Sequence, residues 1–301
     1  MIARRLNEQG CKIDSLDHLP QAIGIGTRRC ASSTVHHWLN QHPEVGKPPR
    51  GLHFFSQHYH RGLNWYCDQL GPHDRAKVLV ESSVSYSYPE YFHNCIDRIA
   101  KLNPKMKIFL TVRHPIDRAF SDFLRSQRHC ELPRTIDFAT AINTNPELLE
   151  RGRYGRLLTH VFDRFPKHQV SVLYYDDLLA KPQEFSAQLY TFLGIDSKFS
   201  PTAAEDPARG RNTVRWAGFN RLVYGTKSIA DSVASQLHLG GRWAGFKKHG
   251  HFLYQHLLAW NTVQSQLPDE IIPRLLDYYE SDINALELFT GRSLDEWRSA
   301  A

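Results

Sequence analysis

The chain has 301 residues, of which 41% are hydrophobic and 23% are charged, and it carries a net charge of +6. These proportions are close to those of soluble globular proteins and exclude a chain that is disordered throughout. The length allows one large α/β domain or two small ones. The mild positive charge favours an anionic ligand, but it is not clustered, so it gives little support to nucleic-acid binding.

The sequence shows no sign of membrane insertion, secretion or metal binding. No apolar run approaches the ~18–20 residues that a membrane span needs, and the first residues, Met1–Glu8, lack the apolar core of a secretory signal. The five cysteines form no CxxC pair, and the histidine pairs at 36–37 and 58–60 lack the spacing of metal ligands. We therefore expect a protein without a metal site that works in a reducing compartment, the cytoplasm.

Short apolar stretches alternate with segments of helical periodicity along most of the chain. The strands are expected at 22–25, 77–80, 107–112 and 170–175. Helical periodicity follows the first strand, follows the third strand from Pro115, and returns between Ile272 and Leu286. This alternation predicts an α/β fold with a central parallel sheet of about four or five strands flanked by helices.

Residues 200–255 differ in composition, because glycines and prolines there are interleaved with aromatic residues such as Trp216 and Trp243. Such a segment favours a long, partly irregular insertion over one face of the protein. No internal repeat or low-complexity tract divides the chain. We therefore expect residues 1–301 to form a single domain that carries this insertion.

The turn after the first strand has the properties of a phosphate-binding loop. Small residues let backbone N–H groups approach an anion, a helix N-terminus contributes about half a positive charge, and arginine binds phosphate in bidentate fashion. An ordinary helix cap with surface arginines would use the same residue types. The loop is neither a Walker A sequence nor a complete dinucleotide fingerprint, which disfavours P-loop kinases and Rossmann dehydrogenases. Its residues are Gly24, Gly26, Arg28, Arg29, Ser32 and Ser33.

A second candidate anion site follows the strand at 107–112. Arg113 comes at the carboxyl end of that strand, where parallel sheets bind ligands, and Ser121 follows two helical turns later. Together they could hold a second phosphate. Alternatively, Arg113 pairs with Asp117 and Ser121 faces solvent, and the spacing alone favours neither interpretation.

Taken in order, these motifs resemble the sulfotransferases that use 3′-phosphoadenosine-5′-phosphosulfate (PAPS), in particular heparan-sulfate-type and bacterial members. The loop at 29–34 resembles their 5′-phosphosulfate loop, and Val112–Phe123 resembles their 3′-phosphate motif. The resemblance covers about residues 20–200 and 267–299 and implies a P-loop-like sulfotransferase fold. Further family-like stretches lie at 53–55, 62–66, 81–86, 175–194 and 288–297.

The resemblance implies a binding role for each matched residue. Arg29 takes the place of the family's loop lysine, on the 5′-phosphate and the bridging oxygen, and Arg28 stands beside it. Arg113 and Ser121 would hold the 3′-phosphate, and Gly210–Arg211 resembles a late loop that closes over the nucleotide. The residues that would cradle the 5′-phosphosulfate are Cys30, Ala31, Ser32 and Ser33.

Two departures from the family pattern concern the group that activates the acceptor. Heparan-type members place a catalytic glutamate where this chain has Gly51, and the lysine that often follows the strand-end glutamate is Ser82 here. The remaining candidates are His53, since a neutral histidine suits deprotonation of a hydroxyl near pH 7, and Glu81, which ends a strand at the ligand-binding edge. Cys30 is read either as a reactive thiol at a helix N-terminus or as a small packing residue.

The expected activity is transfer of the sulfuryl group of PAPS to a hydroxyl or amine of a carbohydrate or small molecule, with 3′-phosphoadenosine-5′-phosphate (PAP) as the product. Arg29 would stabilise the charge on the departing phosphate oxygen. No metal is required, because that leaving group is already a stable phosphate. Two alternatives stay open: a nucleotide-dependent phosphotransferase, and a module that binds the nucleotide or an anionic glycan without turnover, which the missing carboxylate at Gly51 favours.

Overall fold

The computed structural model describes residues 19–47, 49–71, 76–202 and 266–299, together with the backbone of two short strands at 212–214 and 262–264. The chain divides into two compact units. The first comprises the chain up to Arg118, Leu149–Pro207 and the chain from Ile272 onward, and the second comprises Ala119–Leu148 and Ala208–Ile271.

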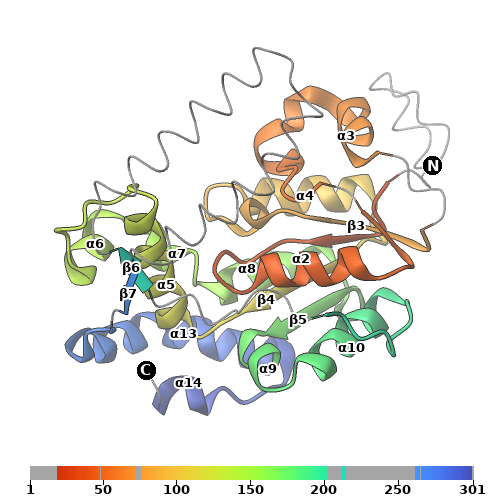
Figure 1. Cartoon of the computed structure of the whole chain (residues 1–301). Helices are drawn as coiled ribbons and strands as arrows, with labels where there is room; N and C mark the ends of the chain where they lie inside the picture. Colours follow the sequence, from red (N-terminus) through yellow and green to blue (C-terminus); the bar gives the residue numbers. More distant parts are fainter. Residues whose placement is uncertain are drawn as a thin grey trace. The chain divides into compact units, whose positions relative to one another are not determined.

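The first unit is built on a sheet of five parallel strands in the order β2-β3-β1-β4-β5 (Figure 1). This confirms the predicted parallel sheet of about four or five strands. The register places Gly24 of β1 beside Ser82 of β3 on one side and beside Phe109 of β4 on the other. The strands are β1 (Ala22–Gly24), β2 (Val45–Gly46), β3 (Val78–Ser82), β4 (Lys107–Val112) and β5 (Val170–Tyr174).

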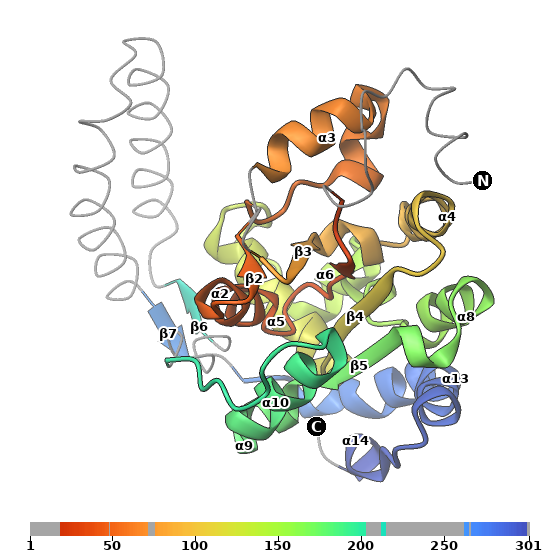
Figure 2. The same ribbon diagram turned by 90° about the vertical axis from the view of Figure 1, so that its right-hand side faces the viewer.

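Helices cover both faces of this sheet, as Figure 2 shows. On one face lie α2 (Ser32–Gln41), α9 (Tyr175–Ala180) and α10 (Pro182–Leu193). On the other lie α4 (Phe92–Leu102) and α8 (Tyr154–Arg164), and α13 (Ile272–Thr290) packs against α8. The remaining helical elements of this unit are η2 (Phe54–His58), η3 (Tyr59–Arg61), α3 (Gly62–Leu70), η4 (Val84–Ser87), η5 (Lys167–Gln169) and α14 (Asp295–Ser299).

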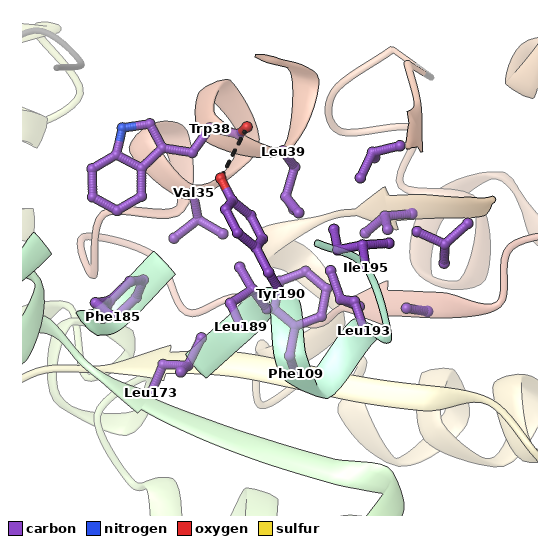
Figure 3. Packing of buried hydrophobic residues seen from close by; sticks show 14 of the residues in the cluster. Val35, Trp38, Leu39, Phe109, Leu173, Phe185, Leu189, Tyr190, Leu193 and Ile195 are labelled. Atoms are coloured by element: carbon purple, nitrogen blue, oxygen red, sulfur yellow. Dashed lines mark hydrogen bonds between the residues drawn. The ribbon is translucent and has the colours of Figure 1, made fainter. Parts of the chain in front are cut away.

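A hydrophobic cluster joins α2 and α10 to the sheet (Figure 3). Helical periodicity places Trp38 and Leu39 of α2 toward Tyr190 of α10, and the Tyr190 hydroxyl donates a hydrogen bond to the Trp38 carbonyl at 3.4 Å. Pro182 occupies the first turn of α10, and Gly194 ends that helix in the left-handed conformation. This packing fixes α2, and with it the turn that leads from β1 into α2.

The second unit contains most of α5 (Pro115–Arg128), α6 (Phe138–Thr144) and an antiparallel pair of strands, β6 (Asn212–Val214) and β7 (Thr262–Gln264). Phe120, Phe123 and Phe138 pack together in its core. Helix α7 (Glu147–Glu150) and the turn η7 (Asp269–Ile271) complete the elements. Within the described segments, no helix combines the length and apolarity that a membrane span requires.

Helix α5 begins at Pro115 and α13 at Ile272, as predicted. The two-residue strand β2 was not predicted. The predicted insertion at 200–255 lies outside the described residues, except for its first three residues and β6, and Gly210 and Arg211 lie outside them as well. The single-domain organisation stays a prediction.

Candidate active site

A pocket of about 300 Å³ opens in the first unit at the carboxyl ends of β1 and β3, beside the first turn of α2. This is the edge at which open parallel sheets bind ligands. Its described lining contains the cationic side chain of Arg50 and the imidazole of His53 but no carboxylate, so its charge suits an anion. The lining residues are Gly24, Gly26, Ser32, Val35, Arg50, Gly51, His53, Ser82, Ser83, Val84, Phe109 and Thr111.

Two glycines that line the pocket are packed closely by neighbouring side chains. A Cβ atom on Gly24 would lie 2.5 Å from Ser82 Oγ and 2.7 Å from Phe109 Cζ. A Cβ atom on Gly26 would lie 2.6 Å from Ser87 Oγ, and this residue has a φ of +125°, which favours glycine. Both positions therefore require the absence of a side chain, which explains the Gly-x-Gly pattern after the first strand.

The loop between β1 and α2 is anchored to the end of β4 and to Arg113, which follows it. The Thr27 hydroxyl lies 2.9 Å from the Thr111 carbonyl, to which it donates. Cys30 Sγ lies 3.6 Å from the Tyr154 hydroxyl, which in turn donates to the Arg113 carbonyl at 3.0 Å. Cys30 is fully buried, and burial raises the pKa of its thiol. These contacts support the packing role of Cys30 rather than a reactive thiolate, and leave only its backbone for a ligand.

The same loop leaves the N-terminus of α2 open to an anion. Arg29 and Ala31 adopt left-handed conformations, with φ values of 72° and 59°. No described side chain caps α2, and its first turn contains no acidic residue, so its leading N–H groups and its positive dipole end can act on a ligand. Arg28 and Arg29 are half-buried beside these groups, and Ser33 is exposed.

Arg113 and Ser121 belong to different units. Arg113 is 6% exposed; its guanidinium stacks 4.6 Å from the Tyr175 ring centroid and lies 3.4 Å from Asp117. The pairing with Asp117, one of the two interpretations of the sequence, is thus present. Ser121 is buried on α5 within the second unit, so it does not face solvent. Joint action of the two residues on one phosphate stays a prediction.

His53 presents its imidazole to the pocket from the segment before η2. Its backbone is left-handed, with a φ of 51°, and its N–H donates to Ser83 Oγ at 2.9 Å. A Cβ atom on Gly51 would lie 3.1 Å from His53 Nε2, so the imidazole borders the space where the family's glutamate would begin. Burial, helped by the charges of His58 and Arg50, lowers the pKa of His53. The ring is therefore neutral at pH 7.

Glu81 is not among the lining residues of this pocket, and its catalytic role stays a prediction. Successive side chains of a strand point to opposite faces, so Ser82 points toward Gly24 while Glu81 points to the other face of the sheet. Glu81 is 0% exposed, and Ser83 Oγ donates to its Oε1 at 2.5 Å. Burial outweighs this hydrogen bond and raises the pKa of Glu81 to about 7.

Comparison with known proteins agrees with this geometry. Residues 52–200 match the model of the sulfotransferase family. The chain belongs to this family. It is 27% identical over 228 residues to human heparan sulfate glucosamine 3-O-sulfotransferase 5, covering 71% of this chain and 65% of the relative. It is also 27% identical over 184 residues to mouse heparan sulfate glucosamine 3-O-sulfotransferase 3B1, covering 59% of this chain and 46% of the relative.

The fold of this chain is similar to that of a sulfotransferase from Alicyclobacillus acidocaldarius, with a TM-score of 0.66. The similarity covers 93% of this chain and 98% of that chain at 18% sequence identity. The P-loop-like sulfotransferase fold expected from the motifs is therefore confirmed. The chain spans about half to two thirds of the length of the curated relatives it matches.

Several residues around the pocket were not predicted from the sequence. Arg50 lies 3.5 Å from Ser32 Oγ at the start of α2, and Ser83, Ser85 and Ser56 surround His53. The three serines gave no signal of their own, because serine is common in turns. Among the described residues, no group of three or more His, Cys, Asp or Glu side chains could hold a metal ion.

Proposed function

We propose that this sulfotransferase transfers the sulfuryl group of PAPS to a hydroxyl or amine of a carbohydrate or small-molecule acceptor. The observation that carries the proposal is one pocket that joins the open N-terminus of α2 to the neutral imidazole of His53. The first suits a phosphosulfate and the second suits an acceptor that must lose a proton. The names of the curated relatives support a carbohydrate hydroxyl as the acceptor.

The donor end of the pocket fits the nucleotide. Gly24 and Gly26 line the pocket, and the close packing of Ser82, Phe109 and Ser87 against them leaves no space for a side chain at either position. Arg28 and Arg29, with the N–H groups of residues 30–33, would hold the 5′-phosphosulfate. Arg113 and Ser121 would hold the 3′-phosphate, as the family resemblance implies, and Gly210–Arg211 would close over the nucleotide.

At the acceptor end, His53 Nε2 takes the proton of the attacking group. When bound, the donor supplies the sulfuryl group: the acceptor oxygen or nitrogen forms a bond to sulfur while the bond from sulfur to the bridging oxygen breaks, and that electron pair leaves with PAP. Arg29 stabilises the negative charge that develops on the bridging oxygen. Such a preorganised donor contributes about 3–4 kcal/mol to lowering the barrier. Glu81 is buried, and Ser83 Oγ connects it to the His53 backbone.

Thermal unfolding with PAP, compared with ATP and magnesium, tests the proposal. At about 100 times its dissociation constant, PAP should stabilise the fold by about 2.7 kcal/mol. We expect PAP to stabilise the fold and ATP with magnesium not to. We also expect transfer of labelled sulfate from PAPS to an oligosaccharide or small-molecule acceptor. Stabilisation by ATP with magnesium alone would instead support a phosphotransferase. PAP binding without transfer to any acceptor would support the non-catalytic module.

A further inference from the structure

A chain of three hydrogen bonds holds the His53 ring on the side away from the pocket. His53 Nδ1 lies 2.7 Å from Ser85 Oγ, and Ser85 Oγ lies 2.6 Å from Ser56 Oγ. The Ser56 hydroxyl donates to the backbone carbonyl of His53 at 3.1 Å. Ser85 is 1% exposed, so bulk water does not replace it as the partner of the ring.

The three bonds can form together in only one arrangement of hydrogens. A serine hydroxyl has a single hydrogen, and a carbonyl oxygen only accepts. The Ser56 hydroxyl therefore donates its hydrogen to the His53 carbonyl. Since Ser56 has no second hydrogen, the Ser85 hydroxyl must be the donor in its bond to Ser56. No hydrogen of Ser85 is left for the ring, so His53 Nδ1 carries a hydrogen and donates to Ser85. In a neutral imidazole only one nitrogen is protonated, so Nε2 is bare.

The backbone of His53 is anchored by a second pair of side chains. Ser83 Oγ donates its hydrogen to Glu81 Oε1, which leaves its lone pairs to accept the His53 N–H. This anchoring helps hold His53 in the left-handed conformation, which is uncommon for a residue other than glycine. The His53 ring thus donates to Ser85, and the His53 backbone N–H donates to Ser83. Each of these serine hydroxyls donates its own hydrogen to another group.

The unprotonated Nε2 of His53 faces space in the pocket that a ligand can occupy. A side chain at position 51 would start 3.1 Å from Nε2, and Gly51 leaves that volume to a ligand. The charged or titratable groups that face the ring are Arg50 and His58, and both disfavour a positive charge on it. Among the described lining residues, no carboxylate competes for the proton of an acceptor.

We propose that Ser85 and Ser56 are positioning residues that set the tautomer of His53, so that its unprotonated Nε2 faces the acceptor. This inference rests on the proposed function. It explains how a sulfotransferase with glycine at the glutamate position keeps a group able to accept a proton. The serines touch neither the donor nor the acceptor; they act through the ring.

Nitrogen-15 NMR of the full chain labelled at histidine tests the tautomer directly, without donor or acceptor. The His53 signals are assigned by their loss in His53→Asn. We expect the wild type to show protonated Nδ1 and bare Nε2 for His53. Ser85→Ala should move the ring toward the Nε2–H form and lower kcat by roughly tenfold or more, with an unchanged KM for PAPS. Ser56→Thr, which keeps the hydroxyl, should restore the tautomer and the kcat lost in Ser56→Ala.

Ser186→Ala is the matched control, because Ser186 is equally buried but lies on α10 and donates to the Gln183 carbonyl. It should change neither the His53 signals nor kcat. A wild-type spectrum with protonated Nε2 at His53 would overturn the inference, and so would an unchanged tautomer in Ser85→Ala. Because the spectrum needs no ligand, this outcome is distinct from failure of the proposed function, which shows as absent stabilisation by PAP.

Discussion

The two ends of the pocket are built from different kinds of groups. At the proposed donor end, the groups available to a ligand are mostly backbone N–H groups of the turn into α2, with Arg28 and Arg29 beside them. At the acceptor end, one imidazole is oriented by side-chain hydroxyls that come from separate segments of the chain. The first arrangement is contiguous in sequence, whereas the second depends on distances between residues about 30 positions apart.

This difference predicts different sensitivities to mutation. Most substitutions leave the backbone N–H groups in place. The donor end should therefore lose function mainly when a charged side chain is removed or a glycine is replaced by a larger residue. The acceptor end depends on single hydrogen atoms, so removal of one side-chain atom can change its chemistry. The following experiments test that contrast in order of the expected effect.

Removal of the imidazole should have the largest effect. In His53→Gln we expect kcat to fall by roughly 10²–10⁴-fold, because the general base is lost, while PAP still stabilises the fold. The wild-type kcat should rise with pH through a pKa below 6.5, since the pKa of His53 is lowered, and this limb should vanish in the variant. Steady-state kinetics from pH 4.5 to 8 measure both. The exposed His168 offers the control His168→Gln, and equal kcat values for the two variants would contradict the acceptor-end assignment.

Removal of the loop charge comes next. Arg29→Ala should lower kcat by roughly 10²–10³-fold at saturating PAPS, because the developing charge on the bridging oxygen loses its partner. Arg29→Lys should retain part of the activity, since it keeps the charge but not the planar geometry. Arg164→Ala, on the exposed surface of α8, is the control. Near-wild-type turnover of Arg29→Ala would remove Arg29 from the mechanism.

The buried carboxyl behind the acceptor end should affect stability rather than binding. The folded-state pKa of Glu81, about 7, lies above its ordinary value of 4.5, so the fold favours the protonated form. Stability should therefore fall as pH rises from 4.5 to 7 and level off above 7. The amide in Glu81→Gln stays neutral, so the variant should lack this component, about 3 kcal/mol in total.

Urea unfolding of both proteins between pH 4.5 and 8 measures the difference, in which the contributions of other titrating groups cancel. Parallel pH dependence of the two proteins would mean that Glu81 ionises as easily in the fold as in the unfolded chain.

Replacement of Gly24 at the donor end should have the smallest effect of the four substitutions. Gly24→Ala places a methyl group against Ser82 Oγ and Phe109, and such overpacking costs about 1–3 kcal/mol. The cost should shrink in a Ser82→Ala background, because one of the two clashes is then removed. Denaturant midpoints of the single and double variants report this coupling, and additive effects would show that Ser82 does not limit the space at Gly24.

Local patterns in the sequence predicted most of the sheet. The strand at 107–112 and the start of α5 at Pro115 were found as predicted, because an apolar run and a helix-starting proline act within a few residues. The strand β2 was missed, since two residues are too few to show a periodicity. The catalytic role of Glu81 stays a prediction, because a strand pattern shows that side chains alternate between faces but not which face carries the pocket.

The sequence by itself determined the family, the parallel α/β architecture and the candidate phosphate loop, since all three depend on short contiguous motifs and on local backbone preferences. Only the tertiary structure decided which side chains meet at the acceptor end. Ser56, Ser83 and Ser85 become informative once their hydroxyls are placed against His53, because a hydrogen-bond network constrains proton positions only when all its distances are known. The role proposed for His53 therefore rests on contacts between segments that are far apart in the chain.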